Sequence, residues 1–150
     1  MSQRNSKDVG RIGFIASAFD LLHAGHIKMI EDAKSKCDYL IAALQTDPTL
    51  DRGYRDKEKN KPIQSLTERQ IMIESIKYID EVITYETEGD LRDLLCHIWP
   101  DIRILGSDWE GKEFTGCQYH IPVYFHQRDH SWSTTDLRER VYQAEKKKRS

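Results

Sequence analysis

Short apolar runs alternate along the chain with segments in which apolar residues recur every three or four positions. The runs have the length and the aliphatic content of strands that are buried on both faces. They lie at residues 11–16, 39–44, 81–84, 102–106 and 121–125. Strands that alternate with helices predict an α/β fold, here a Rossmann-like single domain with a mainly parallel five-stranded sheet and helices on both faces.

The segments between and after these runs carry helical signals. Residues 24–36 place Ile27, Ile30 and Ala33 at helical spacing. A second helix is expected to begin at the capping box of Ser65 and Glu68 and to run through Ile73, Ile76 and Ile79. A third has Asp90 as N-cap, Leu91, Leu94, Leu95 and Ile98 on one face, and Pro100 as its stop; Ser133 or Thr134 caps a last one.

The length of 150 residues fits one domain, with a core at about 10–143, a flexible N-terminus and a basic C-terminal tail. A net charge of −2 argues against a nucleic-acid partner. No apolar run approaches the roughly 20 residues that span a bilayer, and the N-terminus lacks the apolar core of a signal peptide, so we expect no membrane partner and a cytoplasmic location. Three cysteines without Cys-x-x-Cys spacing indicate neither a disulfide framework nor a zinc knuckle. The basic run 146–149 favours a solvated helix end or tail over a tether to lipid or RNA.

His23 and His26 follow the first strand and open the first helix, with Gly25 between them. Unpaired N–H groups at a helix N-terminus favour phosphate, imidazoles add donors, and a glycine permits close approach of the backbone. The pattern therefore predicts a phosphate site. Two alternatives remain open, a zinc-binding pair and a pair of helix caps. Zinc is the weaker one because His97, His120, His126 and His130 show no ligand spacing.

Residues 19–26 read Phe-Asp-x-x-His-x-Gly-His. This stretch resembles the HxGH motif of the nucleotidyltransferase superfamily, and with the blocks at 106–112 and 128–135 the chain is similar to the cytidylyltransferase branch, most of all to its enzymes for glycerol 3-phosphate. The resemblance runs from about Arg11 to Val141. It implies transfer of CMP from CTP to a small phosphorylated alcohol, with release of pyrophosphate and formation of a CDP-activated head group.

The resemblance also implies roles for single residues. The catalytic set is His23, His26, Lys61 and Arg128. Nucleotide contacts are expected from Ser17, Ala18, Phe19, Gly25, Lys59, Asp108, Trp109, Ser133 and Thr134. Acceptor contacts are expected from Lys59, Lys61 and Arg69, although a solvated helix face is an equal alternative for Arg69. A Mg²⁺ ion held mainly by the triphosphate, and a homodimer, complete the expectation.

Some positions depart from the pattern or have two interpretations. Ala18 replaces the hydroxyl that the branch usually has before Phe-Asp, and Trp132, with His130 nearby, replaces an isoleucine. Asp20 either caps the first turn or contacts ligand. Trp109 and Trp132 are expected to flank a ligand, Trp99 to lie in the core, and Tyr119 and His120 to pack within a loop.

Two other functions compete with CMP transfer. The first keeps the reaction but uses ATP on a phosphorylated small molecule, and the block at 108–112 favours CTP over it. The second is a nucleotide-binding module without turnover, motivated by Ala18. An acceptor phosphate is already anionic near pH 7, so catalysis of the expected reaction needs positioning and charge neutralisation rather than a strong base. The acceptor itself is not identified by the sequence.

Overall fold

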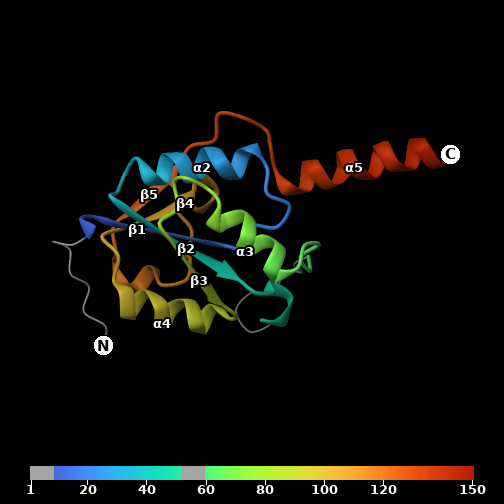
Figure 1. Ribbon diagram of the computed structural model, residues 1–150. Coiled ribbons are helices and arrows are strands. Elements are labelled where there is room, and N and C mark those ends of the chain that lie inside the picture. The colour runs from blue at the N-terminus through green and yellow to red at the C-terminus, as the bar shows by residue number, and fades with distance from the viewer. Residues whose placement is uncertain (1–8, 52–59) are drawn as a thin grey trace.

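The computed structural model describes residues 9–51 and 60–150, and a five-stranded parallel sheet forms its centre (Figure 1). The strands, in the spatial order β3-β2-β1-β4-β5, are β1 (Ile12–Ser17), β2 (Tyr39–Gln45), β3 (Glu81–Tyr85), β4 (Ile102–Gly106) and β5 (Val123–His126). The predicted α/β class and parallel sheet are confirmed.

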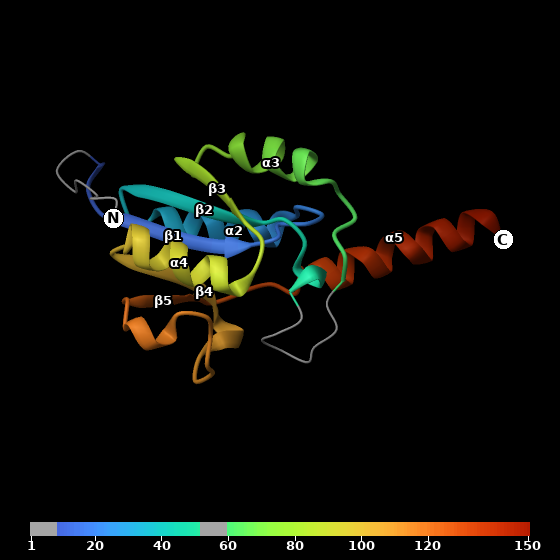
Figure 2. The same ribbon diagram turned by 90° about the horizontal axis from the view of Figure 1, so that it is seen from below.

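Helices cover both faces of the sheet, as the doubly apolar strands require (Figures 1 and 2). Helices α2 (Ala24–Lys34) and α3 (Leu66–Glu74) pack on one face, and α4 (Glu88–Ile98) packs on the other. Helix α5 (Thr134–Arg149) has no buried residue and extends away from the body. The short 3₁₀ helices are η1 (Pro48–Leu50), η2 (Ser107–Trp109) and η3 (Cys117–Tyr119).

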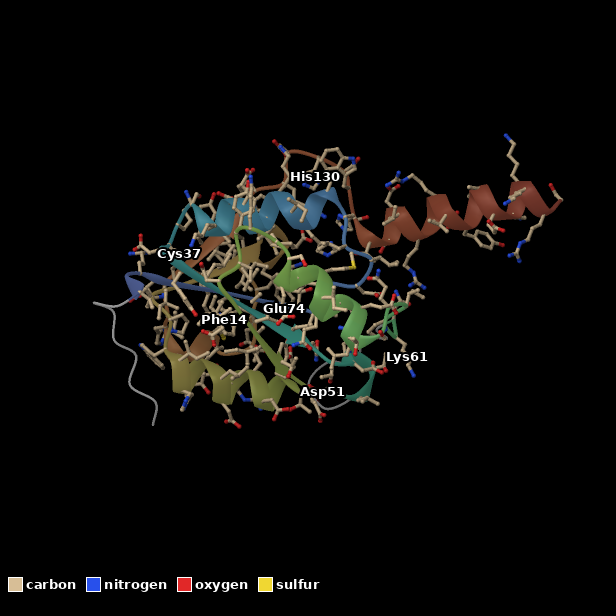
Figure 3. All side chains as sticks on the ribbon, viewed as in Figure 1. Phe14, Cys37, Asp51, Lys61, Glu74 and His130 are labelled. Carbon is tan, nitrogen blue, oxygen red and sulfur yellow. The ribbon has the colours of Figure 1, made fainter. Side chains whose placement is uncertain are left out.

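Strand β2 shows how one apolar run serves two cores. Leu40, Ala42 and Leu44 are buried against α2 and α3, whereas Ile41 and Ala43 are buried on the α4 face. Successive side chains of a strand point to opposite faces, so a strand that is buried on both faces is apolar at nearly every position. Phe14 of β1 likewise lies in the core on the α4 face (Figure 3).

Two helix boundaries in particular differ from the prediction. Helix α3 ends at Glu74, so Ile76 and Ile79 lie beyond it, although both still pack on the core. Asp90 is not the N-cap of α4: Thr87 caps the helix, and Asp90 completes the capping box from the third helical position. Apolar residues three apart occur both in a last helical turn and in a buried connection, so the spacing does not locate the end of α3. Both the first and the last residue of a Thr-x-x-Asp pattern accept backbone N–H groups of a helix start, so either can be taken for the N-cap.

The two ends of the chain were predicted to be flexible or solvated. The basic run forms the exposed last turn of α5, which is the predicted solvated helix end. The expected flexible N-terminus at residues 1–8 lies outside the described residues. None of the described helices has the length and apolarity needed to cross a bilayer.

Candidate active site

The sheet opens between β1 and β4, where the strand order reverses direction. These two strands pair only at Gly13–Ile102 and Phe14–Arg103, so their carboxyl ends separate. Ligands of open α/β sheets bind at this kind of switch point. Two cavities lie beside the carboxyl ends of β1 and β4, one on each face of the sheet.

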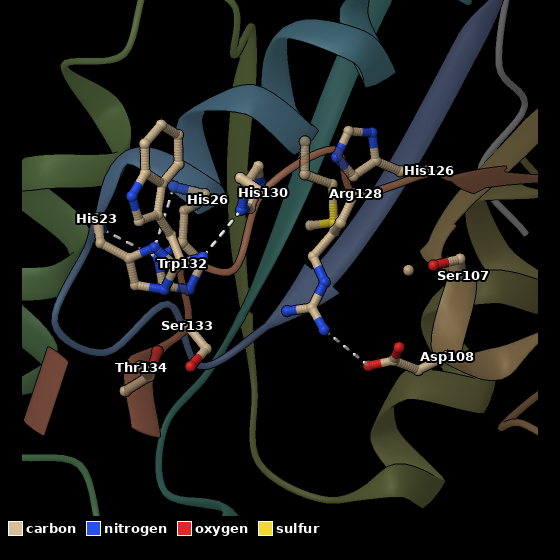
Figure 4. Close-up of a pocket in the computed structure, with 13 residues that line it drawn as sticks. His23, His26, Ser107, Asp108, His126, Arg128, His130, Trp132, Ser133 and Thr134 are labelled. Atoms are coloured by element: carbon tan, nitrogen blue, oxygen red, sulfur yellow. Dashed lines mark hydrogen bonds and ion pairs between the residues drawn. The ribbon is translucent and has the colours of Figure 1, made fainter. Parts of the chain in front are cut away.

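The first cavity, which we call the histidine pocket, has a volume of about 210 Å³ and lies on the α2 side (Figure 4). It is formed by the β1–α2 turn, η2, the segment after β5 and the start of α5. Its polar lining residues include His23, His26, Asp108, Arg128, Ser133 and Thr134. The structure thus brings together the three segments, 19–26, 106–112 and 128–135, that the sequence indicated.

His23 and His26 cap α2 and still have one ring nitrogen each for a ligand. Nδ1 of His23 accepts the Gly25 N–H at 3.0 Å, and Nδ1 of His26 accepts the His23 N–H at 3.1 Å. Because each Nδ1 is an acceptor, the proton of each neutral ring is on Nε2. The ring centroids lie 3.9 Å apart, so the two Nε2–H donors belong to one small region at the positive end of the helix. The capping interpretation and the phosphate interpretation are therefore compatible.

Both rings are held neutral near pH 7. Burial lowers the pKa of His26 to about 4, helped by His23 and opposed by Asp20. Burial also lowers the pKa of His23, and the charges of His130, Arg128 and Arg140 act in the same direction. Neutral Nε2–H groups can donate hydrogen bonds to phosphoryl oxygens without first losing or gaining a proton.

Gly25 is required because two rings close over it. A Cβ at this position would lie 2.9 Å from Cε1 of His23 and 3.0 Å from Cε1 of His130. His130 also stacks on Trp132, with centroids 4.7 Å apart, and its Nδ1 accepts the Trp132 N–H. Trp132 and His130, which the sequence marked as departures, thus form one wall of the pocket (Figure 4).

Other lining residues supply charge and a second helix N-terminus. Arg128 lies 3.7 Å from the Asp108 carboxylate, and both side chains are largely exposed. Ser133 is the N-cap of α5, with its hydroxyl accepting the Asp136 N–H, and Thr134 is the first helical residue. Two helix N-termini and one arginine therefore border a single pocket, which suits a polyanion.

His126 is a lining residue that the sequence analysis did not identify. It ends β5 and is 7% exposed, and its Nδ1 lies 2.7 Å from Oδ2 of Asp32 on α2. The Tyr124 hydroxyl donates to the same oxygen at 3.0 Å. Burial raises the pKa of Asp32, but the hydrogen bonds from His126 and Tyr124 outweigh it and leave the pKa below its usual value. The Asp32 carboxylate accepts a hydrogen bond from Nδ1–H of His126, and in the tautomer with its proton on Nδ1 the Nε2 atom is an acceptor. This Nε2 is buried and has no partner among the described residues.

The second cavity, which we call the Arg103 cavity, has a volume of about 320 Å³ and lies on the α4 side. Ser17, Ala18 and Trp109 line this cavity rather than the histidine pocket. They therefore lie apart from the pocket of His23 and His26, and the nucleotide contacts expected from them stay a prediction.

Asp20 and Phe19 lie outside the histidine pocket and contact the segments that form it. The Asp20 carboxylate accepts the N–H groups of Ile63 and Gln64 at 2.8 and 3.0 Å, so it neither caps α2 nor faces the pocket. Phe19 is 1% exposed and meets the ring of His26 edge-on at 5.8 Å. Phe19 therefore packs behind His26 instead of presenting a surface to nucleotide.

Arg69 is buried, at 2% exposure, which contradicts the expected solvated helix face. Its guanidinium donates to four backbone carbonyls, those of Ala18, Gln45, Thr46 and Gln64. A side chain engaged in this way ties the β1–α2 turn to the ends of β2 and to the start of α3. Arg69 thus positions the turn from inside the fold, and its expected contact with the acceptor is corrected to this role.

The remaining predicted residues are distributed as follows. Lys59 lies outside the described residues, and Lys61 is exposed, far from His130, and lines neither cavity (Figure 3). Trp99 is 47% exposed as the left-handed C-cap of α4, so the expected core position is wrong. It contacts Tyr119, whose packing role is confirmed, at a centroid distance of 5.9 Å.

Comparison with known proteins agrees with this geometry. The sequence pattern of the cytidylyltransferase-like family matches residues 14–140, so the chain belongs to this family. The chain is 36% identical over 124 residues to glycerol-3-phosphate cytidylyltransferase of Bacillus subtilis, covering 82% of this chain and 91% of that one, and 34% identical to the Staphylococcus aureus enzyme, covering 83% and 89%. It is 30% identical to the bifunctional protein HldE of Helicobacter pylori, of which it spans 28%.

Solved structures show the same fold. A lipopolysaccharide core biosynthesis protein from Thermoplasma volcanium superposes with a TM-score of 0.61 at 25% identity, covering 81% of this chain and 98% of that one. Pantothenate synthetase from Thermus thermophilus superposes with a TM-score of 0.54 at 12% identity, covering 79% and 55%. The resemblance that the HxGH segment indicated is confirmed by the family match.

Proposed function

We propose that this chain, which belongs to the cytidylyltransferase-like family, transfers CMP from CTP to a small phosphorylated alcohol such as glycerol 3-phosphate, releasing pyrophosphate. It is a nucleotidyltransferase by family, and the identity of the nucleotide and of the acceptor is the proposal. The observation that carries it is the pair of neutral Nε2–H donors, from His23 and His26, at the N-terminus of α2.

The reaction is a displacement at the α-phosphorus. An oxygen of the acceptor phosphate forms a bond to this phosphorus while the bond to the bridging oxygen breaks, and the leaving electron pair departs with pyrophosphate. Negative charge on the transferring group would be stabilised by the Nε2–H groups of His23 and His26. The N-terminus of α5 and Arg128 would hold the β and γ phosphates. No residue needs to act as a nucleophile or strong base.

His126 favours a base with an exocyclic amino group. Its Nε2 is an acceptor in the tautomer whose Nδ1–H donates to Asp32, and it has no partner among the described residues. Cytosine offers an N–H donor at its 4-position, whereas uracil offers a carbonyl that would leave two acceptors facing each other. Leaving a buried polar group unpaired is costly, so the arrangement supports CTP over UTP.

The pocket suits a Mg²⁺ ion that is held mainly by substrate phosphates. Mg²⁺ usually keeps several waters and takes only one or two carboxylates beside the phosphates, and Asp108 is a carboxylate that lines the pocket. When bound, the ion would neutralise part of the triphosphate charge. We also retain Lys59 and Lys61 as proposed phosphate contacts from the loop before α3, and a homodimer as the proposed assembly.

A screen of pyrophosphate release tests the proposal. CTP, UTP and ATP are each combined with glycerol 3-phosphate, ribitol 5-phosphate, phosphoethanolamine and phosphocholine in the presence of Mg²⁺. We expect release with CTP and a polyol phosphate. Greater release with ATP would support the adenylyltransferase alternative, and CTP binding without release from any combination would support the module without turnover.

A further inference from the structure

The Arg103 cavity contains a buried cation whose hydrogen bonds are incomplete. Arg103, on β4, is 3% exposed, and its Nη1 donates to the Thr115 carbonyl at 2.6 Å. Its guanidinium lies 5.2 Å from the ring centroid of Phe114, and its Nε is buried and has no hydrogen-bond partner within residues 9–51 and 60–150. Burial lowers the pKa of Arg103 to about 10, which leaves the group charged at pH 7. A buried cation without an ion-pair partner is costly to maintain.

A buried carboxylate oxygen lines the same cavity. Glu88 is the first residue of α4, and its Oε1 accepts a hydrogen bond from the Thr115 hydroxyl at 3.1 Å. Its Oε2 is buried and has no partner in the part of the chain that the structure describes. Arg103 and Glu88 influence one another electrostatically, but the described residues show no ion pair between them. One unused donor and one unused acceptor thus line a single cavity.

The cavity adjoins the histidine pocket at the β1–β4 edge. Ser17 and Ala18 of the β1 end line it, and His23 follows within the same turn. At the end of β4, Leu105 and Trp109 line this cavity, whereas Ser107 and Asp108 line the histidine pocket. Consecutive stretches of chain at the carboxyl ends of β1 and β4 therefore border both cavities.

We propose that Arg103 and Glu88 bind hydroxyl groups at the end of the acceptor distal to its phosphate, so that the acceptor is a phosphorylated polyol or sugar longer than glycerol 3-phosphate. This inference rests on the proposed function and specifies its acceptor. A hydroxyl donates to Glu88 Oε2 and accepts from Arg103 Nε–H, so it satisfies both orphaned atoms. The opposite charges of the pair offset each other, which disfavours an acceptor with a further charge at this end.

The size of the cavity agrees with a longer acceptor. Its volume of about 320 Å³ exceeds the 210 Å³ of the histidine pocket. Glycerol 3-phosphate has three carbons and two free hydroxyl groups, and it would leave much of this volume to solvent. A polyol phosphate with five or six carbons would fill it.

The test compares acceptors of different length. Rates of pyrophosphate release from CTP are measured with glycerol 3-phosphate, ribitol 5-phosphate and sorbitol 6-phosphate for the wild type, Glu88→Gln and Arg103→Met. Glu88→Gln keeps an oxygen for the Thr115 hydroxyl, and Glu86→Gln, an exposed position just before α4, is the matched control.

We expect the wild type to have a kcat/KM at least about tenfold higher with a longer acceptor than with glycerol 3-phosphate. Both variants should lose this preference, mainly through a higher KM for the longer acceptors, whereas Glu86→Gln should keep it. Equal use of all acceptors by the wild type, or an equal fall with every acceptor in both variants, would overturn the inference and leave CMP transfer standing. No release with any acceptor would overturn the proposed function and this assignment with it.

Discussion

The histidine pocket and the Arg103 cavity flank the same pair of strand ends but are built in different ways. In the histidine pocket, donors come from two short stretches of chain, and each ring of His23 and His26 is fixed by a backbone N–H of its own turn. In the Arg103 cavity, the polar groups come from β4, the start of α4 and the loop before η3, and two of their atoms find no partner among the residues that the structure describes. The groups assigned to the reaction thus come from residues close together in the sequence. The groups assigned to acceptor choice come from segments that are distant in sequence and that only the fold brings together.

This contrast predicts which substitutions act alike on all acceptors. His23→Asn keeps a side-chain acceptor for the Gly25 N–H, and hence the cap, but removes the Nε2–H donor. We expect kcat to fall about a hundred- to a thousandfold with every acceptor, about 3 to 4 kcal/mol of transition-state stabilisation. Steady-state turnover beside a melting curve measures it, with His97→Asn on the exposed side of α4 as control. Near-normal turnover, or a loss confined to one acceptor, would refute the division of roles.

The two buried arginines sharpen the contrast through stability. Arg69→Met would orphan four carbonyls and should lower the free energy of unfolding by about 3 kcal/mol. Arg103→Met removes one hydrogen bond and a poorly paired charge, so we expect a loss of about 1 kcal/mol or less. Urea unfolding of both variants compares them directly. Equal losses would mean that Arg103 is a structural clamp like Arg69.

A smaller effect is expected for nucleotide choice. His126→Phe keeps a ring at the end of β5 but removes the acceptor for an amino group, so the ratio of the Kd for UTP to that for CTP should fall about tenfold. Tyr124→Phe, which leaves the contact between His126 and Asp32 in place, is the control and should keep the ratio. Calorimetry with both nucleotides measures it. An unchanged ratio in His126→Phe would show that His126 does not contact the amino group of the base.

The smallest effect concerns pH. His26 has a folded-state pKa of about 4, below its ordinary value of 6.5, so between these values the unfolded chain binds more protons than the folded one. The contribution of His26 to stability is therefore present above about pH 6.5 and is lost as the pH falls toward 4. Unfolding of the wild type at pH 7 and pH 5 should show a larger difference than unfolding of His26→Gln. An identical difference would mean that His26 is not held neutral.

The fold was predictable where local signals agree with one another. The strand from Ile102 to Gly106 has its predicted bounds, and the capping box of Ser65 and Glu68 begins α3 as expected. The end of α3 was not predictable, because Ile76 and Ile79 bury their side chains from a connection that keeps the apolar spacing of a helix. The N-cap of α4 was missed because Thr87 and Asp90 serve the same capping box from its two ends.

The site was predictable to the extent that it lies in contiguous motifs. The turn at 23–26 and the start of α5 carry their own signals, and the structure places both at the histidine pocket. His126 and Arg103 have no such sequence signal, because the roles proposed for them depend on Asp32 and Glu88, which are distant in sequence. Arg69 was misjudged because its partners are backbone carbonyls of three separate segments, which no pattern of residue types reveals.

The most direct test of the central claim is to identify the product formed from CTP. The wild-type protein is incubated with Mg²⁺, CTP and a polyol phosphate, and the products are analysed by mass spectrometry together with pyrophosphate. We predict a product whose mass is that of the acceptor plus CMP less water, with one pyrophosphate released for each molecule formed. Formation of CMP or CDP without this adduct, or adduct formation from ATP in preference to CTP, would contradict the account.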